Sequence, residues 1–282
     1  MNEHYVTRTM TSQEVDLAID WAAREGWNPG LHDAHCYPIA DPNGFLAGLL
    51  DGRLIASLSA VRYDKTFGFL GFYMVTPEYR GQGYGIRLWD AGMRYLQGCT
   101  IGLDGVVEQQ ANYARSGFRL AYRNVRYQGS GGGEAPADPD IVPLSSLPFA
   151  AVAAYDAPFF PADRSAFLKD WIGQPQGHAL GILRAGTLAG YGVMRRCRAG
   201  YKVGPLFADT PELAEKLFLA LRTRAGADEP VFLDVPECNS EAVKLCERHA
   251  MTVGFETARM YRGEAPDISL SRTFGVTSFE IG

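Results

Sequence analysis

A glycine-rich turn between a strand-like run and a helix-like run is the part of this chain best suited to chemistry. The turn reads Arg80-Gly81-Gln82-Gly83-Tyr84-Gly85, and the apolar run Phe67 to Val75 precedes it. After the turn, apolar residues recur at helical spacing, at Ile86, Trp89, Met93 and Leu96. Such a turn directs several backbone N–H groups into one concavity at the positive end of a helix dipole. We therefore expect a phosphate-binding loop, in which glycines allow close approach and Arg80 adds a fixed positive charge.

The spacing of the glycines excludes two common phosphate loops. A Walker loop ends in Gly-Lys-Ser/Thr, whereas this chain has Gly85-Ile86-Arg87. A dinucleotide-binding loop places its first glycine close behind the strand and a third glycine three positions after the second. Here Gly81 lies six residues beyond Val75, and Ile86 occupies the position of that third glycine. The pattern that remains is Arg/Gln-x-x-Gly-x-Gly/Ala.

This pattern, preceded by Val75-x-Pro77, resembles the acetyl-CoA loop of the GNAT superfamily of N-acyltransferases. The resemblance implies that the loop amides bind the coenzyme A pyrophosphate. It also implies that the strand before the loop carries a bulge, pairs its backbone with the pantetheine arm and offers an N–H to the thioester carbonyl. The cofactor-binding residues implied in this way are Tyr73, Met74, Val75, Arg80, Gly81, Gln82, Gly83, Tyr84, Gly85 and Ile86.

A second motif resembles the same family. Tyr113-Ala114-Arg115-Ser116-Gly117-Phe118 is similar to the family's Tyr-x-x-x-Gly-Phe, whose tyrosine often protonates the departing CoA sulfur. A phenol with a pKa near 10 can donate a proton to a thiolate whose pKa is about 8.5 when the two are in contact. The alternative is that Tyr113 only packs under its helix. Gln109 and Asn112, on or beside that helix, are expected to reach the pantetheine amides.

The general base is open among several residues in the first half of the chain. The segment Glu25 to Gly30, together with Asp33, resembles a substrate loop of tandem GNAT proteins. On this resemblance we expect Glu25 to be the base, and Trp27, Asn28 and Asp33 to contact the acceptor. The other candidates for the base are His32, Asp33, Asp64, Glu108 and a chain of water molecules.

An aromatic, proline-stiffened segment, Tyr155 to Arg164, is the candidate lining of an acceptor pocket between the two halves. Phe159 is the residue of this segment that we expect to contact the acceptor. The alternative is a loop that packs on its own domain. The last segment, Phe274 to Ile281, alternates apolar and polar residues, which is typical of an ordered strand, and it could dock across both domains.

An internal duplication sets the domain organisation. Thr76-Pro77-Glu78 recurs 134 residues later as Thr210-Pro211-Glu212, and the Gly52-x-Leu54 turn recurs as Gly186-x-Leu188 at the same offset. Residues 130–140 have the composition of a linker. We therefore expect a catalytic domain over residues 1–129, a linker over 130–140 and a second domain over 141–282 that shapes the acceptor site.

The second copy has lost the residues that carry the chemistry. At the offset of 134, the loop Arg80 to Gly85 becomes Ala214 to Leu219, which contains no glycine and places Glu215 where a phosphate would lie. The position of Tyr113 corresponds to Cys246. The chain thus resembles tandem GNAT proteins in which one half binds the cofactor and the other is degenerate.

Composition excludes several other classes of protein. A net charge of −5 without a basic block argues against a nucleic-acid partner, and no apolar run approaches the roughly twenty residues of a membrane span. Five scattered cysteines without Cys-x-x-Cys indicate reduced thiols and a cytoplasmic location, with no signal peptide expected. His32 and His35 are three apart, but their surroundings predict no shared helix, so no metal site is expected.

These observations predict an α/β fold with a mixed sheet, built as two GNAT-like domains in tandem. The resemblance implies transfer of an acetyl group from acetyl-CoA to a small amine or amino acid. A non-catalytic acyl-CoA-binding or sensor protein is the alternative. We expect a monomer or a homodimer.

Overall fold

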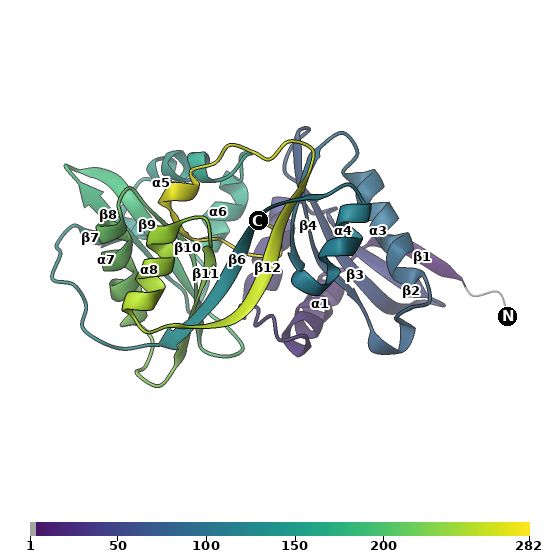
Figure 1. Cartoon of the computed structure of the whole chain (residues 1–282), viewed down its shortest axis with the longest axis horizontal. Helices are drawn as coiled ribbons and strands as arrows, with labels where there is room; N and C mark the ends of the chain where they lie inside the picture. The colour runs from purple at the N-terminus through teal and green to yellow at the C-terminus, as the bar shows by residue number, and fades with distance from the viewer. Residues whose placement is uncertain (1–3) are drawn as a thin grey trace.

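The first half of the chain forms an α/β unit in the computed structural model, which describes residues 4–282 (Figure 1). Its strands and helices are β1 Tyr5–Thr9, α1 Ser12–Arg24, α2 Asp33–Ala40, β2 Phe45–Leu50, β3 Arg53–Arg62, β4 Phe67–Val75, η1 Pro77–Tyr79, α3 Tyr84–Tyr95, β5 Thr100–Val106, η2 Val107–Gln109, α4 Gln110–Arg115 and β6 Arg119–Ser130.

The second half repeats this order from its first strand, β7, onwards, which confirms the duplication. Its elements are β7 Ile141–Pro143, η3 Leu144–Ser146, α5 Phe149–Asp156, η4 Ala157–Phe159, α6 Ser165–Trp171, β8 His178–Arg184, β9 Thr187–Arg196, β10 Tyr201–Ala208, α7 Pro211–Arg222, β11 Pro230–Pro236, α8 Ser240–Arg248, β12 Thr252–Arg262, η5 Leu270–Arg272 and β13 Thr273–Gly275. Helix α7 thus takes the place of the glycine loop and α3.

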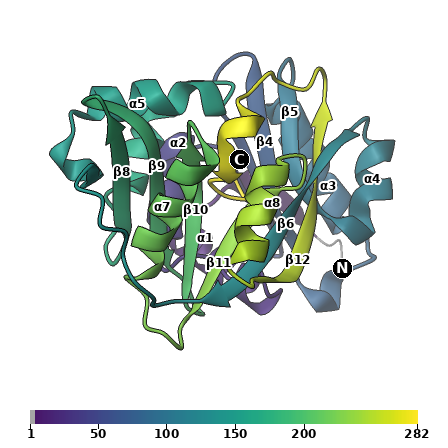
Figure 2. The ribbon, with the colours of Figure 1, turned by 60° about the vertical axis from the view of Figure 1, so that its left-hand side comes forward.

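The two halves exchange their last long strands within one mixed sheet. The strand order is β1-β2-β3-β4-β5-β12-β6-β11-β10-β9-β8-β7, and β13 pairs with β10. Strand β12 therefore lies between β5 and β6, and the two exchanged strands run side by side across the middle of the molecule (Figure 2). Strand β6 does not close the first half, because its residues 124–130 pair with β11 of the second half.

The first helix matches its sequence signals. The Thr11 hydroxyl accepts a hydrogen bond from the Glu14 N–H, and the Glu14 carboxylate accepts one from the Thr11 N–H, which forms a capping box. Helix α2 was not expected. It contains Pro38 and presents almost no amphipathic pattern, and it includes His35 while His32 lies at its N-cap. Only His35 lies within the helix, so the two histidines share no helix, as predicted, although the helix itself was not.

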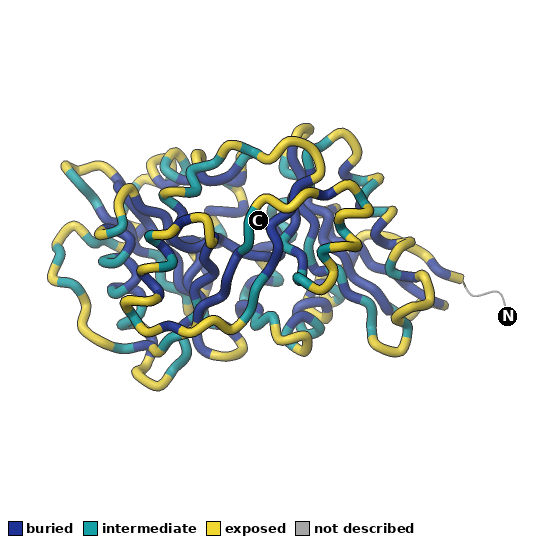
Figure 3. The backbone as a smooth tube through the Cα atoms, in the orientation of Figure 1, coloured by how far each residue is buried: buried dark blue, intermediate teal, exposed yellow. Residues whose placement is uncertain are grey.

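The buried residues form cores on both faces of the sheet, and one core spans both halves (Figure 3). In this shared core Tyr37 of α2 stacks on Trp171 of α6, with ring centroids 5.7 Å apart. Tyr37 also meets Phe72 of β4 edge-on at 5.6 Å. Because apolar burial is the main stabilising contribution, the two halves are held together by their cores as well as by the sheet.

The last residues of the chain dock into the first half. Beyond β13 they are not a strand, but Ser278, Glu280 and Ile281 are all buried. The Ser59 hydroxyl donates to the Glu280 carbonyl at 3.1 Å, and the Tyr63 hydroxyl donates to the Ile281 carbonyl at 2.7 Å. The expected docking across both domains is confirmed, whereas strand structure is limited to Thr273–Gly275.

The expected linker is held against the second half. The Gly131 N–H donates to the Glu229 carbonyl at 2.8 Å, and the Asp138 carboxylate pairs with Lys216 and Arg184. No helix within residues 4–282 is long and apolar enough to cross a bilayer.

Candidate active site

The glycine turn adopts a backbone that only glycine readily provides. Gly81 and Gly83 have φ angles of +74° and +87°, in the left-handed region, and a Cβ at either position would meet nothing within 4 Å. Gly83 is the N-cap of α3 and has no side chain to cap the helix. The turn therefore presents a helix N-terminus, where backbone N–H groups and the helix dipole favour an anion.

Gly85 is required for a different reason. A Cβ on Gly85 would lie 2.7 Å from the Tyr73 hydroxyl oxygen and 3.0 Å from the Val75 Cγ2 atom. The first turn of α3 thus packs directly against the end of β4. This close approach puts the helix N-terminus beside the strand that the family resemblance assigns to pantetheine.

Arg80 is fixed at the mouth of the site. Its Nε donates to the Val75 carbonyl at 2.8 Å, and its Nη2 pairs with a Glu25 carboxylate oxygen at 2.5 Å. Both side chains are partly exposed, at 51% and 39%. The guanidinium is therefore positioned by the protein while one side remains open to a ligand.

Strand β4 carries the bulge that the resemblance implies. Phe72 has a φ of +47°, and the pairing of β3 with β4 shifts register between Ser57 and Ser59. The Ser57 hydroxyl donates to the Phe72 carbonyl at 2.8 Å and so fixes the distorted peptide. A bulge of this kind interrupts the ladder and turns backbone groups toward the neighbouring space.

A cavity of about 580 Å³ follows β4 from this bulge to the glycine turn. Its walls come from β4, the turn, the start of α3, β5, α4, β12 and the last residues of the chain. A volume of this size is in the range of small-molecule sites. The residues expected at the cofactor that line it are Tyr73, Met74, Val75, Arg80, Gly81, Gly83, Gly85, Ile86 and Gln109.

Three residues expected at the cofactor do not line the cavity. The Gln82 amide donates to the Glu78 carbonyl, and Tyr84 is buried with its carbonyl accepting from the Tyr5 hydroxyl. The Asn112 amide donates to the Gln109 side-chain oxygen at 2.5 Å on the exposed face of α4. These contacts hold the three side chains away from the cavity.

Tyr113 lines the cavity from α4. Its ring stacks on Trp89 with centroids 5.7 Å apart and planes 29° apart. A Cβ on the neighbouring Gly105 would lie 2.1 Å from the Tyr113 ring, so a glycine there makes room for the phenol. Burial raises the pKa of Tyr113 to about 12, which keeps the hydroxyl protonated and able to donate.

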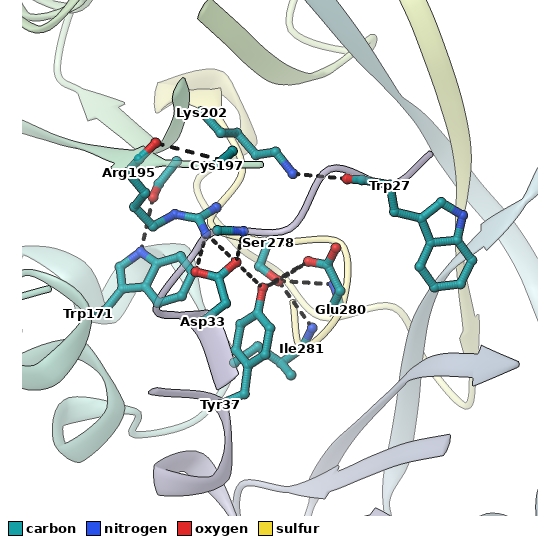
Figure 4. Close-up of polar contacts among 12 residues, drawn as sticks. Trp27, Asp33, Tyr37, Trp171, Arg195, Cys197, Lys202, Ser278, Glu280 and Ile281 are labelled. Carbon is teal, nitrogen blue, oxygen red and sulfur yellow. Dashed lines mark hydrogen bonds and ion pairs between the residues drawn. The ribbon is translucent and has the colours of Figure 1, made fainter. Parts of the chain in front are cut away.

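Only some of the residues expected at the acceptor line the cavity. Glu25 and Trp27 line the cavity. Asn28 does not, because its side chain exchanges two hydrogen bonds of 2.9 Å with the backbone of Ala199. Asp33 is also outside the lining. It is fully buried against Arg195 at 2.5 Å, and that ion pair joins α2 to β9 (Figure 4).

The segment Tyr155 to Arg164 lies away from this cavity and packs against both halves of the chain. Phe159 stacks face to face on Phe207 of β10, with centroids 4.0 Å apart. Arg164 forms a two-pronged ion pair with Asp156, and both are buried. Phe160 meets Phe67 of β4 edge-on at 5.5 Å, so the aromatic residues of this segment complete cores shared by both halves and do not line the cavity.

Of the candidate bases, Glu25 lines the cavity, whereas His32, Asp64 and Glu108 do not. The Asp64 carboxylate instead accepts backbone N–H bonds from Thr66 and Phe67 in a turn. Across residues 4–282 no group of three or more His, Cys, Asp or Glu side chains is arranged to hold a metal ion.

Sequence reasoning missed the residues that the second half contributes to the cavity. Phe255 and Thr257 come from β12, and Phe279 and Glu280 from the last turn of the chain. Asp104 of β5 joins them, paired with Arg259 at 2.5 Å. No local signal marks these positions, since they reach the site only through the strand exchange and the docked tail.

The second half retains no phosphate loop. Positions 214–219 lie inside helix α7, where Leu217 and Phe218 are core residues. Glu215 pairs with Arg248 and His249 of α8 at 2.9 Å each. A helix interior with all its N–H groups bonded offers no anion site.

Comparison with known proteins agrees with this organisation. A family model described as "Acetyltransferase (GNAT) family" matches residues 13–118, and one described as "Acetyltransferase (GNAT) domain" matches residues 152–275. The holothin acyltransferase of Pseudoalteromonas sp. (strain SANK 73390) is 29% identical over 284 residues, covering 100% of this chain and 97% of that protein.

Solved structures show the same fold. One from Pyrococcus horikoshii has a TM-score of 0.83 at 20% identity and covers 99% of this chain and 96% of its own. A tandem GNAT protein from the clavulanic acid biosynthesis pathway has a TM-score of 0.65 at 13% identity. The match covers 93% of this chain and 100% of that protein. With a family match in each half and one continuous fold, the chain belongs to the GNAT superfamily of acyltransferases, as a tandem protein of two GNAT domains.

Proposed function

We propose that this acyltransferase transfers an acetyl group from acetyl-CoA to the amine of a small molecule. One observation carries the proposal: a single cavity connects the glycine turn, the bulged strand β4 and the Tyr113 phenol. These three features supply an anion site, a backbone surface for an extended arm and a proton donor. Transfer from a thioester needs all three along one line.

Each group has a role in this scheme. The N–H groups of the turn and Arg80 bind the pyrophosphate, and the edge of β4 from Tyr73 to Val75 pairs with pantetheine. The Tyr113 hydroxyl protonates the sulfur as the C–S bond breaks. Its raised pKa supports this role, because a phenol that stays neutral retains the proton it must donate.

The enclosed shape supports a small acceptor. The cavity is walled by both halves of the chain, and the strand exchange fixes those walls relative to each other. A peptide tail would need an open groove, whereas a small amine needs only a pocket.

The test is the release of free thiol from acetyl-CoA in the presence of a panel of primary amines. Turnover that depends on one class of amine, with the acetylated product found by mass spectrometry, supports the proposal. Tight binding of acetyl-CoA without thiol release for any acceptor would contradict it and would favour an acyl-CoA-binding or sensor protein.

A further inference from the structure

We propose that Glu280 receives the amine of the acceptor, and that the acceptor carries this amine on a flat apolar body without a carboxylate group. The inference rests on the proposed function and specifies the acceptor end of the same cavity. Glu280 is contributed by the last turn of the chain and lies beside Gly71 in the middle of β4, away from the glycine turn.

The position of Glu280 is fixed by backbone contacts to the bulged strand. A Cβ on Gly71 would lie 2.0 Å from the Glu280 carbonyl oxygen, so the two backbones touch. The Ser59 hydroxyl donates to that carbonyl at 3.1 Å. Gly71 adjoins Phe72 at the bulge and lies four residues from Val75, roughly 13 Å along an extended strand. Glu280 therefore stands beside the bulge, where the resemblance places the thioester.

The Glu280 carboxylate has hydrogen bonds but no counter-ion in contact. The Ser278 hydroxyl donates to Oε2 at 2.6 Å (Figure 4). The Tyr37 hydroxyl lies 3.1 Å from the same oxygen and 3.1 Å from Asp33 Oδ2, and it shares its one proton between these two acceptors. Throughout residues 4–282 no cationic side chain pairs with Glu280, and its other oxygen accepts no hydrogen bond from these residues. A carboxylate only 4% exposed that lines a cavity in this way is set to receive a donor from a ligand.

The cations near Glu280 are committed elsewhere. Arg126 forms a two-pronged ion pair with Asp234 at 2.6 and 2.7 Å. Lys202 donates to the Trp27 carbonyl at 3.4 Å, and burial lowers its pKa. Neither side chain lines the cavity. Neither side chain occupies the Glu280 carboxylate.

Aromatic rings wall the space next to this carboxylate. Phe255 and Phe279 lie 6.4 Å apart at 43°, and Trp27 lines the same cavity. The Arg126 guanidinium lies 5.0 Å from the Phe279 ring centroid, on the side occupied by Asp234. Rings that line a cavity favour a flat apolar molecule that can pack against them.

The charges of the lining exclude a carboxylate on the acceptor. The charged residues that line the cavity are Glu25, Arg80, Asp104 and Glu280. Arg80 lies at the cofactor end and already pairs with Glu25, and Asp104 pairs with Arg259. The acceptor end thus holds the unpaired charge of Glu280 and no free cation, so a second carboxylate would be repelled.

Glu280 and Tyr113 together account for every proton transferred in the reaction. The acceptor binds as an ammonium and gives one proton to Glu280, which leaves a neutral amine. The nitrogen attacks the thioester carbon, and the C–S bond breaks with its electron pair on sulfur. Sulfur takes the proton of Tyr113, and the phenolate regains one from the nitrogen. The amide and free CoA leave, and Glu280 returns its proton to water.

The first test compares matched acceptors by thiol release from acetyl-CoA. We expect tryptamine and phenethylamine to exceed tryptophan and phenylalanine by at least about tenfold in kcat/KM, the effect of one like-charge repulsion. Tryptophan methyl ester should behave like tryptamine. Equal or better use of the free amino acids would overturn the inference, as would turnover confined to aliphatic amines. No turnover with any amine would overturn the proposed function itself.

The second test replaces the carboxylate while keeping its shape. Glu280→Gln should lower kcat/KM for tryptamine about a hundredfold, as for loss of a general base, and leave acetyl-CoA affinity by calorimetry unchanged. The loss of kcat/KM should be much smaller with an aniline, because an aniline is already uncharged at neutral pH and has no proton to give to Glu280. Glu264→Gln, on an exposed residue, is the charge-matched control. An equal loss for both amines would indicate a structural role and overturn the inference, as would wild-type activity.

Discussion

Gly105 and Tyr113 are in such close contact that a single methyl group on Gly105 would lie 2.1 Å from the phenol ring. Gly105 belongs to β5 and Tyr113 to α4, so the glycine sets the depth at which the phenol enters the cavity. We expect Gly105→Ala to displace the ring and lower kcat at least tenfold, because a proton donor must stay within hydrogen-bond reach. Steady-state kinetics measures this. Gly173→Ala, whose Cβ would make only ordinary contacts, should have no effect, and normal activity in Gly105→Ala would show that the depth is unimportant.

Tyr113 itself should act after binding. Tyr113→Phe removes the hydroxyl but keeps the stacking on Trp89, so acetyl-CoA affinity should be nearly unchanged while kcat falls about a hundredfold. Calorimetry and thiol release separate the two quantities. Wild-type turnover would show that the phenol only packs. Loss of affinity with unchanged kcat would place it in the cofactor site.

The glycine turn should carry the binding of CoA. Gly83→Glu places bulk and negative charge at the N-terminus of α3, and we expect no measurable affinity for CoA by calorimetry. Gly52→Glu is the matched control, since Gly52 has a similar φ of +84° and equally open surroundings in the β2–β3 turn. Both variants carry the same backbone strain. Loss of binding in both would therefore refute a specific role for the turn.

One molecule of CoA should bind per chain. Helix α7 occupies the place of the turn in the second half, and Glu215 holds Arg248 and His249 there. A titration of the wild-type protein with CoA should give a stoichiometry near one. Two sites of comparable affinity would contradict the assignment of the second half as degenerate.

The capping box of α1 should contribute stability that depends on pH. The bond from Arg8 lowers the pKa of Glu14 to about 2, so the ionised form stabilises the fold. This contribution is present above the unfolded pKa, near 4.3, and is lost as pH falls toward 2. Glu14→Gln should therefore unfold in urea with about 0.5–1 kcal/mol less stability at pH 7. The difference in unfolding free energy between the wild type and Glu14→Gln should become smaller below about pH 4. A constant difference at all pH values would refute this origin.

The parts of the site that follow from local sequence were predictable, and the parts made by distant contacts were not. The glycine turn, the first helix and the Tyr113 motif are each defined by residues that are close together in the sequence. The bond that seats Glu280 joins residues 221 positions apart. Strands β6 and β12 are similar in sequence pattern, and pattern alone does not say which of them pairs with β5. Helix α2 contains a proline and lacks an apolar stripe, so its sequence carried no helical signal.

The exchanged strands also decide how a ligand can reach the cavity. In a protein whose domains meet only at an interface, rotation about a hinge can open the space between them. Here the ladder β5-β12-β6-β11 runs unbroken from one half to the other, so such a rotation would tear backbone hydrogen bonds. The continuous sheet therefore makes the two halves one rigid body. On the proposed function, acetyl-CoA and its acceptor would therefore reach each other through movements of loops and side chains that line the cavity, such as Arg80, Trp27 and Phe279.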